Sequence, residues 1–396
     1  MNLMTFIRQI GLVYIIPFII YLINPFNKGF LFGYLLTLAL ILKGKKLIPY
    51  LDRDFIFLSL FAITYALFYA VYQESGIQFI FIYALFPSFF YLFGKYLVLP
   101  KMRPNHLVLL FFSIGILFSF SQLLSVILNL RQGGFSQIDR GIPYFWNGKI
   151  SSATQVAAYF TFNMCLPIIF LVKRQGVPLL LNFLTGTFFI ASLLSVFRVG
   201  SRTLLLICIL AILASLLYVV PRQSRKVNLR LFLFLGLFLI ILPQFINLNL
   251  NADYLSVLGT RLQESNNTSS AGGRTSLWLQ SLENIFKYPM GWQGPGVRYS
   301  HNLWLDVARY AGLIPFFLLL MFTFRSIRNT YKAVRKTPQS LLLNTTIITF
   351  SLSSILVFFV EPIMEGLFFL FTVFCVFQGM INAYLKMPRI PIIKEN

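Results

Sequence analysis

Charged residues are scarce in this chain, and their scarcity excludes most soluble folds. Asp, Glu, Lys and Arg make up 11% of the 396 residues, whereas a soluble domain carries about a quarter. Hydrophobic residues make up 58%, and the mean hydropathy is +0.78. Apolar runs of roughly 15–25 residues recur along the chain, and each is long enough to cross a bilayer core of about 30 Å. The sequence therefore predicts an all-α polytopic membrane protein.

Acidic residues, histidine and cysteine are also rare, which restricts the sites that the chain can build. It has 11 Asp and Glu, two His and three Cys. The cysteines lie inside apolar runs, so we expect packing residues rather than a disulfide framework or a metal site. The one Asp-x-Asp spacing, Asp52-Arg53-Asp54, falls in a predicted cytoplasmic segment and is expected to be a solvated loop. We expect neither a metal nor a cofactor.

Positive charge, in contrast, is abundant, and its distribution sets the orientation. The net charge is +22, but Lys and Arg gather in short clusters between apolar runs, which argues against nucleic acid as a partner. Alternate loops hold 22 and 10 of the 33 Lys and Arg, with Arg309 inside a span. Because cytoplasmic loops are enriched in positive charge, both termini are predicted to be cytoplasmic, which requires an even number of spans. The first apolar run has no small-residue cleavage site, so no cleavable signal is expected.

About twelve spans are expected, and a re-entrant hairpin is the alternative for the first two, which are short. The expected spans are Gln9–Ile23, Gly29–Leu42, Phe55–Tyr72, Ile77–Leu99, Leu107–Leu130, Ser152–Val172, Pro178–Val196, Thr203–Val220, Leu231–Ile246, Leu303–Phe324, Leu341–Val360 and Gly366–Leu385.

The predicted spans divide the chain into three parts. Residues 1–246 hold nine spans and an outer loop at 131–151, residues 247–302 form a large periplasmic loop, and residues 303–396 hold three spans and a cytoplasmic tail. The large loop is too long to be a mere connection. Within it, Tyr254–Ser265 and Arg274–Phe286 have apolar residues at helical spacing, so two amphipathic helices on the membrane surface are expected.

The spans themselves are almost free of charge, and polar side chains gather at the predicted outer surface. Ion-coupled transporters keep ionisable groups near the middle of the membrane, whereas this chain has a cationic outer rim. Any single arginine there has the simpler explanation of an interface anchor. The rim contains Arg131, Arg140, Lys149, Arg198, Arg202, Arg261, Arg274, Arg298 and His301.

Two outer segments carry a motif. The first is Phe197–Leu204 (FRVGSRTL), and the second runs from Gly272 to Pro315 and contains an Arg before a Trp, a Pro-x-Gly turn, His-Asn and a later Gly. Together they resemble the O-antigen polymerase and O-antigen ligase superfamily of bacterial envelopes. The matching positions are Ser201, Arg202, Arg274, Trp278, Pro289, Gly291, His301, Asn302 and Gly312. The chain departs from the pattern at Tyr310, where many members have an acidic residue.

The resemblance implies glycan transfer from an undecaprenyl-pyrophosphate-linked donor on the periplasmic face of the bacterial inner membrane. Pyrophosphate leaves as an anion, and the arginine fork suits it because it binds phosphate bidentately and stays charged. The attacking sugar hydroxyl needs a base, and imidazole works near neutral pH. We therefore expect Arg202, Arg274 and His301 to be catalytic, with substrate contacts from Arg140, Arg198, Arg298, Asn302 and Trp278.

Three functions stay open at this point. A polymerase, which we favour, transfers glycan to a lipid-linked acceptor, and a chain-length regulator would be its further partner. A ligase transfers the glycan to lipid A-core with the same donor chemistry. A flippase for lipid-linked oligosaccharides belongs to another class, and it would be expected to show charge deep in its spans and two similar halves.

Overall fold

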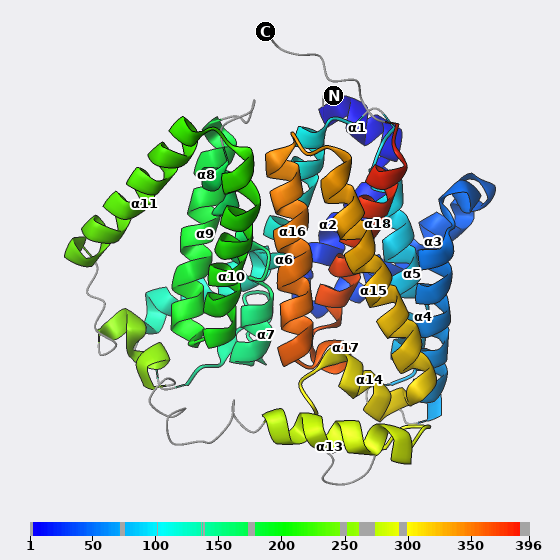
Figure 1. The fold of residues 1–396 in the computed structure, drawn as a ribbon. Coiled ribbons are helices and arrows are strands. Elements are labelled where there is room, and N and C mark those ends of the chain that lie inside the picture. The colour runs from blue at the N-terminus through cyan, green and yellow to red at the C-terminus, as the bar shows by residue number, and fades with distance from the viewer. Residues whose placement is uncertain are drawn as a thin grey trace.

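A computed structural model describes residues 3–71, 76–100, 102–135, 137, 139–172, 179–245, 252–260, 274–292 and 299–388. Over these residues the protein is almost entirely helical (Figure 1). Its one small sheet pairs two-residue strands, β1 (Ile142–Pro143) and β2 (Ile150–Ser151), in antiparallel register. The protein is an all-α membrane protein, as its composition predicts.

Seven helices of the described residues are long and apolar enough to cross a membrane. They are α4 (Arg53–Val71), α5 (Gln78–Leu97), α6 (Pro104–Gly133), α9 (Leu179–Val199), α10 (Arg202–Val219), α16 (Leu341–Val360) and α18 (Phe368–Lys386). An eighth span results if the bent pair α1 (Leu3–Ile10) and α2 (Leu12–Ile23) counts as one, although the pair is bent by 99°. The expected count of twelve is therefore not confirmed.

Three expected spans are interrupted in the structure. Gly11, with φ +97°, separates α1 from α2, and Gly312, with φ +78°, separates α14 (Leu303–Ala311) from α15 (Leu313–Lys336). Glycine adopts this left-handed backbone without steric cost, so it breaks a helix that its apolar neighbours would continue. The segment expected at Ser152–Val172 forms short pieces, α7 (Ala153–Ala158), η3 (Asn163–Cys165) and α8 (Ile168–Leu171).

The remaining helices connect these elements. They are η1 (Pro25–Asn27), α3 (Gly29–Lys43), η2 (Gly44–Tyr50), η4 (Val220–Arg222), α11 (Arg225–Phe245), η5 (Asp253–Leu255), α13 (Arg274–Lys287) and α17 (Ile363–Gly366), with a further helical stretch at 256–260. In Figure 1, α1 and the last turn of α18 lie at one end of the bundle, and α13 and α14 lie across the other.

The centre of the bundle is built on a close contact between α5 and α18. A Cβ atom added at Gly94 would lie 2.0 Å from the carbonyl oxygen of Val376, and one at Gly379 would lie 2.0 Å from that of Tyr91. Only glycine fits at both positions, which lets the two backbones touch, as small residues do between membrane helices. Phenylalanines of α18, such as Phe371 and Phe377, fill the surrounding core.

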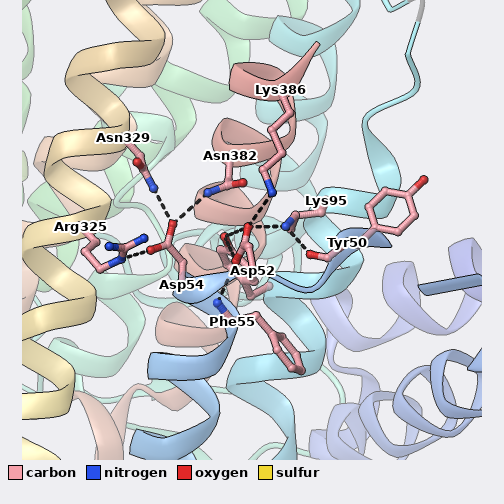
Figure 2. Close-up of polar contacts among 10 residues, drawn as sticks. Tyr50, Asp52, Asp54, Phe55, Lys95, Arg325, Asn329, Asn382 and Lys386 are labelled. Carbon is pink, nitrogen blue, oxygen red and sulfur yellow. Dashed lines mark hydrogen bonds and ion pairs between the residues drawn. The ribbon is translucent and has the colours of Figure 1, made fainter. Parts of the chain in front are cut away.

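The expectation of a solvated loop at Asp52-Arg53-Asp54 is wrong. Asp54 is 3% exposed. One of its oxygens accepts a hydrogen bond from Arg325, and the other accepts from Asn329 (2.7 Å) and Asn382 (2.9 Å) (Figure 2). A buried carboxylate must be paired to offset its loss of hydration. Asp54 therefore ties α4 to α15 and α18.

Asp52 completes this network on its other side. Its oxygens accept hydrogen bonds from Lys95, from the Tyr91 hydroxyl (3.2 and 3.3 Å), from Lys386 (3.2 Å) and from the backbone N–H of Phe55 (3.0 Å) (Figure 2). We call Asp52, Asp54 and their donors the inner cluster. It joins four helices at one end of the bundle, so its role is structural.

Candidate active site

Helix α13 begins with Arg274, one of the candidate site residues. Its range almost coincides with that of the second expected amphipathic helix, Arg274–Phe286. One side of it packs against α14, where Ile285 is buried with Trp292 and Ala308. The other side carries exposed apolar residues: Leu279 is 58%, Leu282 is 52% and Phe286 is 77% exposed. Of two apolar residues one turn apart on this helix, Leu282 is therefore exposed and Ile285 is buried.

The turn after α13 is joined to the junction of α14 and α15 through the backbone. Trp292 N–H donates to the carbonyl of Arg309, and Leu313 N–H donates to the carbonyl of Pro289, both at 2.9 Å. Gly291 and Gly312 have positive φ, and a Cβ at Gly312 would lie 2.3 Å from the Pro289 oxygen. The Pro-x-Gly turn and the last glycine of the motif therefore form one backbone crossing, for which only glycine leaves room.

His301 lies between this crossing and the start of α14, in a constrained backbone. Its φ is +54°, which is uncommon for a residue other than glycine. The buried carboxylate of Asp306 accepts the N–H of Ser300 (2.6 Å) and that of Asn302 (3.2 Å), so it holds the chain on both sides of His301. We call this arrangement the Asp306 clamp.

Asn302 and Trp278 also form hydrogen bonds that hold the backbone around His301. The Asn302 side chain caps α14 by accepting the N–H groups of Trp304 and Leu305, both at 3.2 Å. The indole of Trp278 donates to the Ser300 carbonyl at 2.8 Å. In the structure both residues therefore hold the backbone beside His301, and these contacts give a physical reason for the two motif positions.

Glu361 brings the two central motif residues together. It follows α16, and one oxygen lies 3.6 Å from Nη2 of Arg274 while the other lies 4.0 Å from Nδ1 of His301. Arg274 and His301 are 29% and 36% exposed, and Glu361 is 11% exposed. Among the described residues, Glu361 Oε2 and His301 Nδ1 have no hydrogen-bond partner. We call Arg274, His301 and Glu361 the outer triad.

The electrostatics of the outer triad favour a neutral imidazole. Burial and the nearby Arg274 lower the pKa of His301 below its ordinary value. Burial raises the pKa of Glu361 to about 7, although Arg274 opposes the shift. Desolvation disfavours a charged form in both cases. A histidine and a carboxyl group that face each other, both with shifted pKa values, are typical of an active site.

A second group of arginines surrounds the turn between α9 and α10. Arg198 is fully buried, and it donates to Asn129 Oδ1 and to the Asp139 carbonyl, both at 2.9 Å. Arg140 donates twice to the Val199 carbonyl, at 2.9 and 2.6 Å. Arg202 is the first residue of α10, which Ser201 caps. In the structure, Arg140 and Arg198 therefore brace the turn before Arg202.

This turn also touches the large loop. Gly200, with φ +62°, lies so close to Val257 that an added Cβ would be 2.8 Å from its Cγ1. Arg298, the remaining residue expected at the site, lies outside the described residues.

Glu361 is the residue that sequence reasoning missed. Nothing in its spacing pairs it with a histidine 60 positions earlier (301 to 361). The only local signal is a carboxylate directly after a long apolar run, followed by a proline.

Over the described residues, His, Cys, Asp and Glu form no group of three or more that could hold a metal ion. Compared with known proteins, the chain matches no family model, and no curated protein matches it.

Proposed function

We propose that the protein is a membrane glycosyltransferase that joins glycans carried on a polyprenyl pyrophosphate, and that the outer triad is its catalytic centre. The observation that supports this most is the meeting of Arg274 and His301 around Glu361. A phosphate-binding cation and a base of suitable pKa are what the reaction needs, and they come from different segments. The motif residues between them serve to fix the backbone of this centre.

In this mechanism the acceptor hydroxyl attacks the anomeric carbon of the donor sugar. The bond from that carbon to the pyrophosphate oxygen breaks, and the pyrophosphate leaves as an anion. The hydroxyl proton passes to Nε2 of His301, because Nδ1 faces Glu361. Arg274 stabilises charge on the leaving group with its fork of donors. Arg202, the first residue of α10, is proposed to hold the other phosphate, and Arg298 to bind substrate.

Glu361 is a positioning residue in this proposal. In the structure its Oε2 and Nδ1 of His301 are 4.0 Å apart and not hydrogen-bonded. In this proposal they approach when Glu361 is ionised, so that Glu361 accepts the Nδ1–H and fixes the tautomer whose Nε2 is a base. It also lies against Arg274, so binding of a pyrophosphate to Arg274 competes with that ion pair. The carboxylate thus links occupation of the phosphate site to the state of the base.

The proposed location is the bacterial inner membrane, with both termini in the cytoplasm and the outer triad on the periplasmic side. A cysteine at Thr275 on α13 should react with an impermeant thiol reagent in intact spheroplasts, and one at Gln339 should react only after lysis. Both positions are exposed, and the native cysteines are buried. The reverse labelling pattern would mean that the topology is inverted. The outer triad would then face the cytoplasm, away from the proposed periplasmic donor.

Between the two activities that share this chemistry we propose a polymerase, with a lipid-linked glycan as acceptor and a chain-length regulator as a further partner. The test is deletion of the gene followed by a gel of the cell's lipopolysaccharide. Loss of all but a single repeat unit indicates the polymerase. Loss of every repeat from lipid A-core, with long chains left on the carrier, indicates a ligase, and an unchanged ladder rejects both.

A further inference from the structure

A cavity of about 820 Å³ lies at the end of the bundle opposite the outer triad. It is enclosed by the elbow between α1 and α2, the last turns of α3, η2 and the end of α5. In Figure 1, α1 crosses this end of the bundle. Its lining includes Val13, Tyr14, Leu42, Lys43, Lys46 and Tyr96.

The lining of the cavity is divided between cationic and apolar residues. Lys43 and Lys46 supply two positive charges, and none of the lining residues is acidic. The apolar side includes Val13 and Leu42, which are 62% and 77% exposed. Large apolar side chains left this exposed beside two lysines form an amphipathic surface.

Lys43 is held in place by aromatic rings. Its ammonium lies 3.4 Å from the ring centroid of Tyr96 and 4.6 Å from that of Tyr14. Among the described residues neither Lys43 nor Lys46 forms an ion pair, whereas nearby Lys95 is paired with Asp52. Cation–π contacts orient an ammonium but leave its charge unneutralised. The cavity therefore presents a fixed, unpaired cation.

We infer that this cavity binds an anionic glycerophospholipid of the adjoining leaflet. The phosphate would lie between Lys43 and Lys46, and an acyl chain would run along Val13, Ala39 and Leu42. A basic pocket between membrane helices at the headgroup level is a usual site for acidic lipids. A soluble phosphate would satisfy the lysines but leave the apolar side bare, so the lipid is the better match to both halves of the cavity.

The sequence around the lysines supplies a matched control. Lys45 lies between them in the sequence, carries the same charge and is exposed like Lys46, yet it does not line the cavity. A general attraction between membrane and basic residues would affect all three lysines alike. A specific lipid-binding site, in contrast, would depend on Lys43 and Lys46 but not on Lys45.

The test is native mass spectrometry of the full-length protein. The protein is released from detergent micelles that contain either phosphatidylglycerol or phosphatidylcholine with the same acyl chains. The wild type should retain phosphatidylglycerol in preference. Each of Lys43→Gln and Lys46→Gln should weaken retention about fivefold, and Lys45→Gln should leave it unchanged. Leu42→Gln, at an exposed position that folding does not need, should weaken retention while both lysines remain.

Three results would overturn the inference. They are equal retention of the two lipids, an equal loss in all three lysine variants, and full displacement of phosphatidylglycerol by glycerol phosphate. The last result would mean that the headgroup alone is recognised. Thermal unfolding in phosphatidylcholine, where the site is empty, should be the same for all variants, and it separates lost binding from lost folding.

Discussion

The protein places its charges in two clusters at opposite ends of the bundle, and the clusters differ in how completely they are bonded. In the inner cluster both oxygens of Asp52 and of Asp54 accept hydrogen bonds. In the outer triad the contacts are 3.6 and 4.0 Å long, and Arg274 and His301 are about one-third exposed. The inner cluster includes Asn382 and Lys386 near the end of α18. The 19 residues of this helix span about 28 Å.

This difference separates two uses of charge within one membrane protein. Buried polar groups that hold helices together are bonded almost without exception, because an unmade bond is costly. Groups that act on a ligand must keep unused hydrogen-bond donors or acceptors and access to solvent. Full bonding of the two carboxylates thus indicates a structural role for the inner cluster, and incomplete bonding identifies the outer triad as the candidate site.

The contrast between the two clusters would fail most clearly if His301 could be replaced without loss of activity. His301→Asn tolerates the left-handed backbone, since asparagine adopts it readily, but it lacks the base. Turnover of purified enzyme should fall by about 10²–10⁴-fold, while the donor still binds. Wild-type turnover in the variant would make His301 a structural residue. Loss of wild-type activity in EDTA would refute the metal-free mechanism.

The inner cluster should respond in the opposite way. Asp54→Asn leaves Arg325 without its buried partner, and breaking such a pair costs about 3–5 kcal/mol, at the lower end here because Arg325 is 32% exposed. Thermal unfolding in detergent should show the loss, and the specific activity of the folded fraction should be unchanged. Glu283→Gln, at an exposed position of α13, is the control. A stable but inactive Asp54→Asn would place the inner cluster in the mechanism.

A smaller effect is expected when the outer arginines keep their charge but lose their fork. Arg274→Lys and Arg202→Lys should each lower kcat/KM by roughly tenfold, less than the ~10²–10³ expected for removing a donor altogether. Arg131→Lys, at an exposed position at the end of α6, should have no effect. Equal activity in all three would leave only general positive charge as the role of these arginines.

The smallest effect concerns pH and tests the link between Glu361 and His301. Activity should rise in two steps, one below the ordinary histidine pKa as His301 loses its proton, and one at about 7 as Glu361 ionises. Glu361→Gln should keep the first step and lose the second. Asp306, whose burial raises its pKa to about 6, is common to both proteins, so the difference between the pH profiles reports on Glu361. Persistence of both steps would remove Glu361 from the proposal.

The sequence predicted the membrane class because a helix long enough to cross a bilayer needs a long apolar run, and such runs are visible directly. It did not predict the breaks at Gly11 and Gly312. A glycine within an apolar run looks like part of a span, and only the surrounding packing decides whether its φ becomes positive. The helix at Arg274 was predictable because apolar residues recur in it at helical spacing.

The candidate site was predictable in part for a related reason. Arg274 and His301 belong to a motif, so they could be singled out, whereas Glu361 could not, because its partner is distant in sequence. Asp54 was misread for the same reason: its donors Arg325, Asn329 and Asn382 lie 271, 275 and 328 residues away. Local sequence carries no information on such pairings, which depend on the tertiary fold.

The Asp306 clamp has a consequence for how the rate should depend on temperature. Since both backbone neighbours of His301 are bonded to one buried carboxylate, the imidazole is oriented before any substrate arrives. Little ordering of the chain then remains to be done on the way to the transition state. An Eyring treatment of the rate of the chemical step should accordingly give an activation entropy near zero, and loosening the clamp should make it strongly negative.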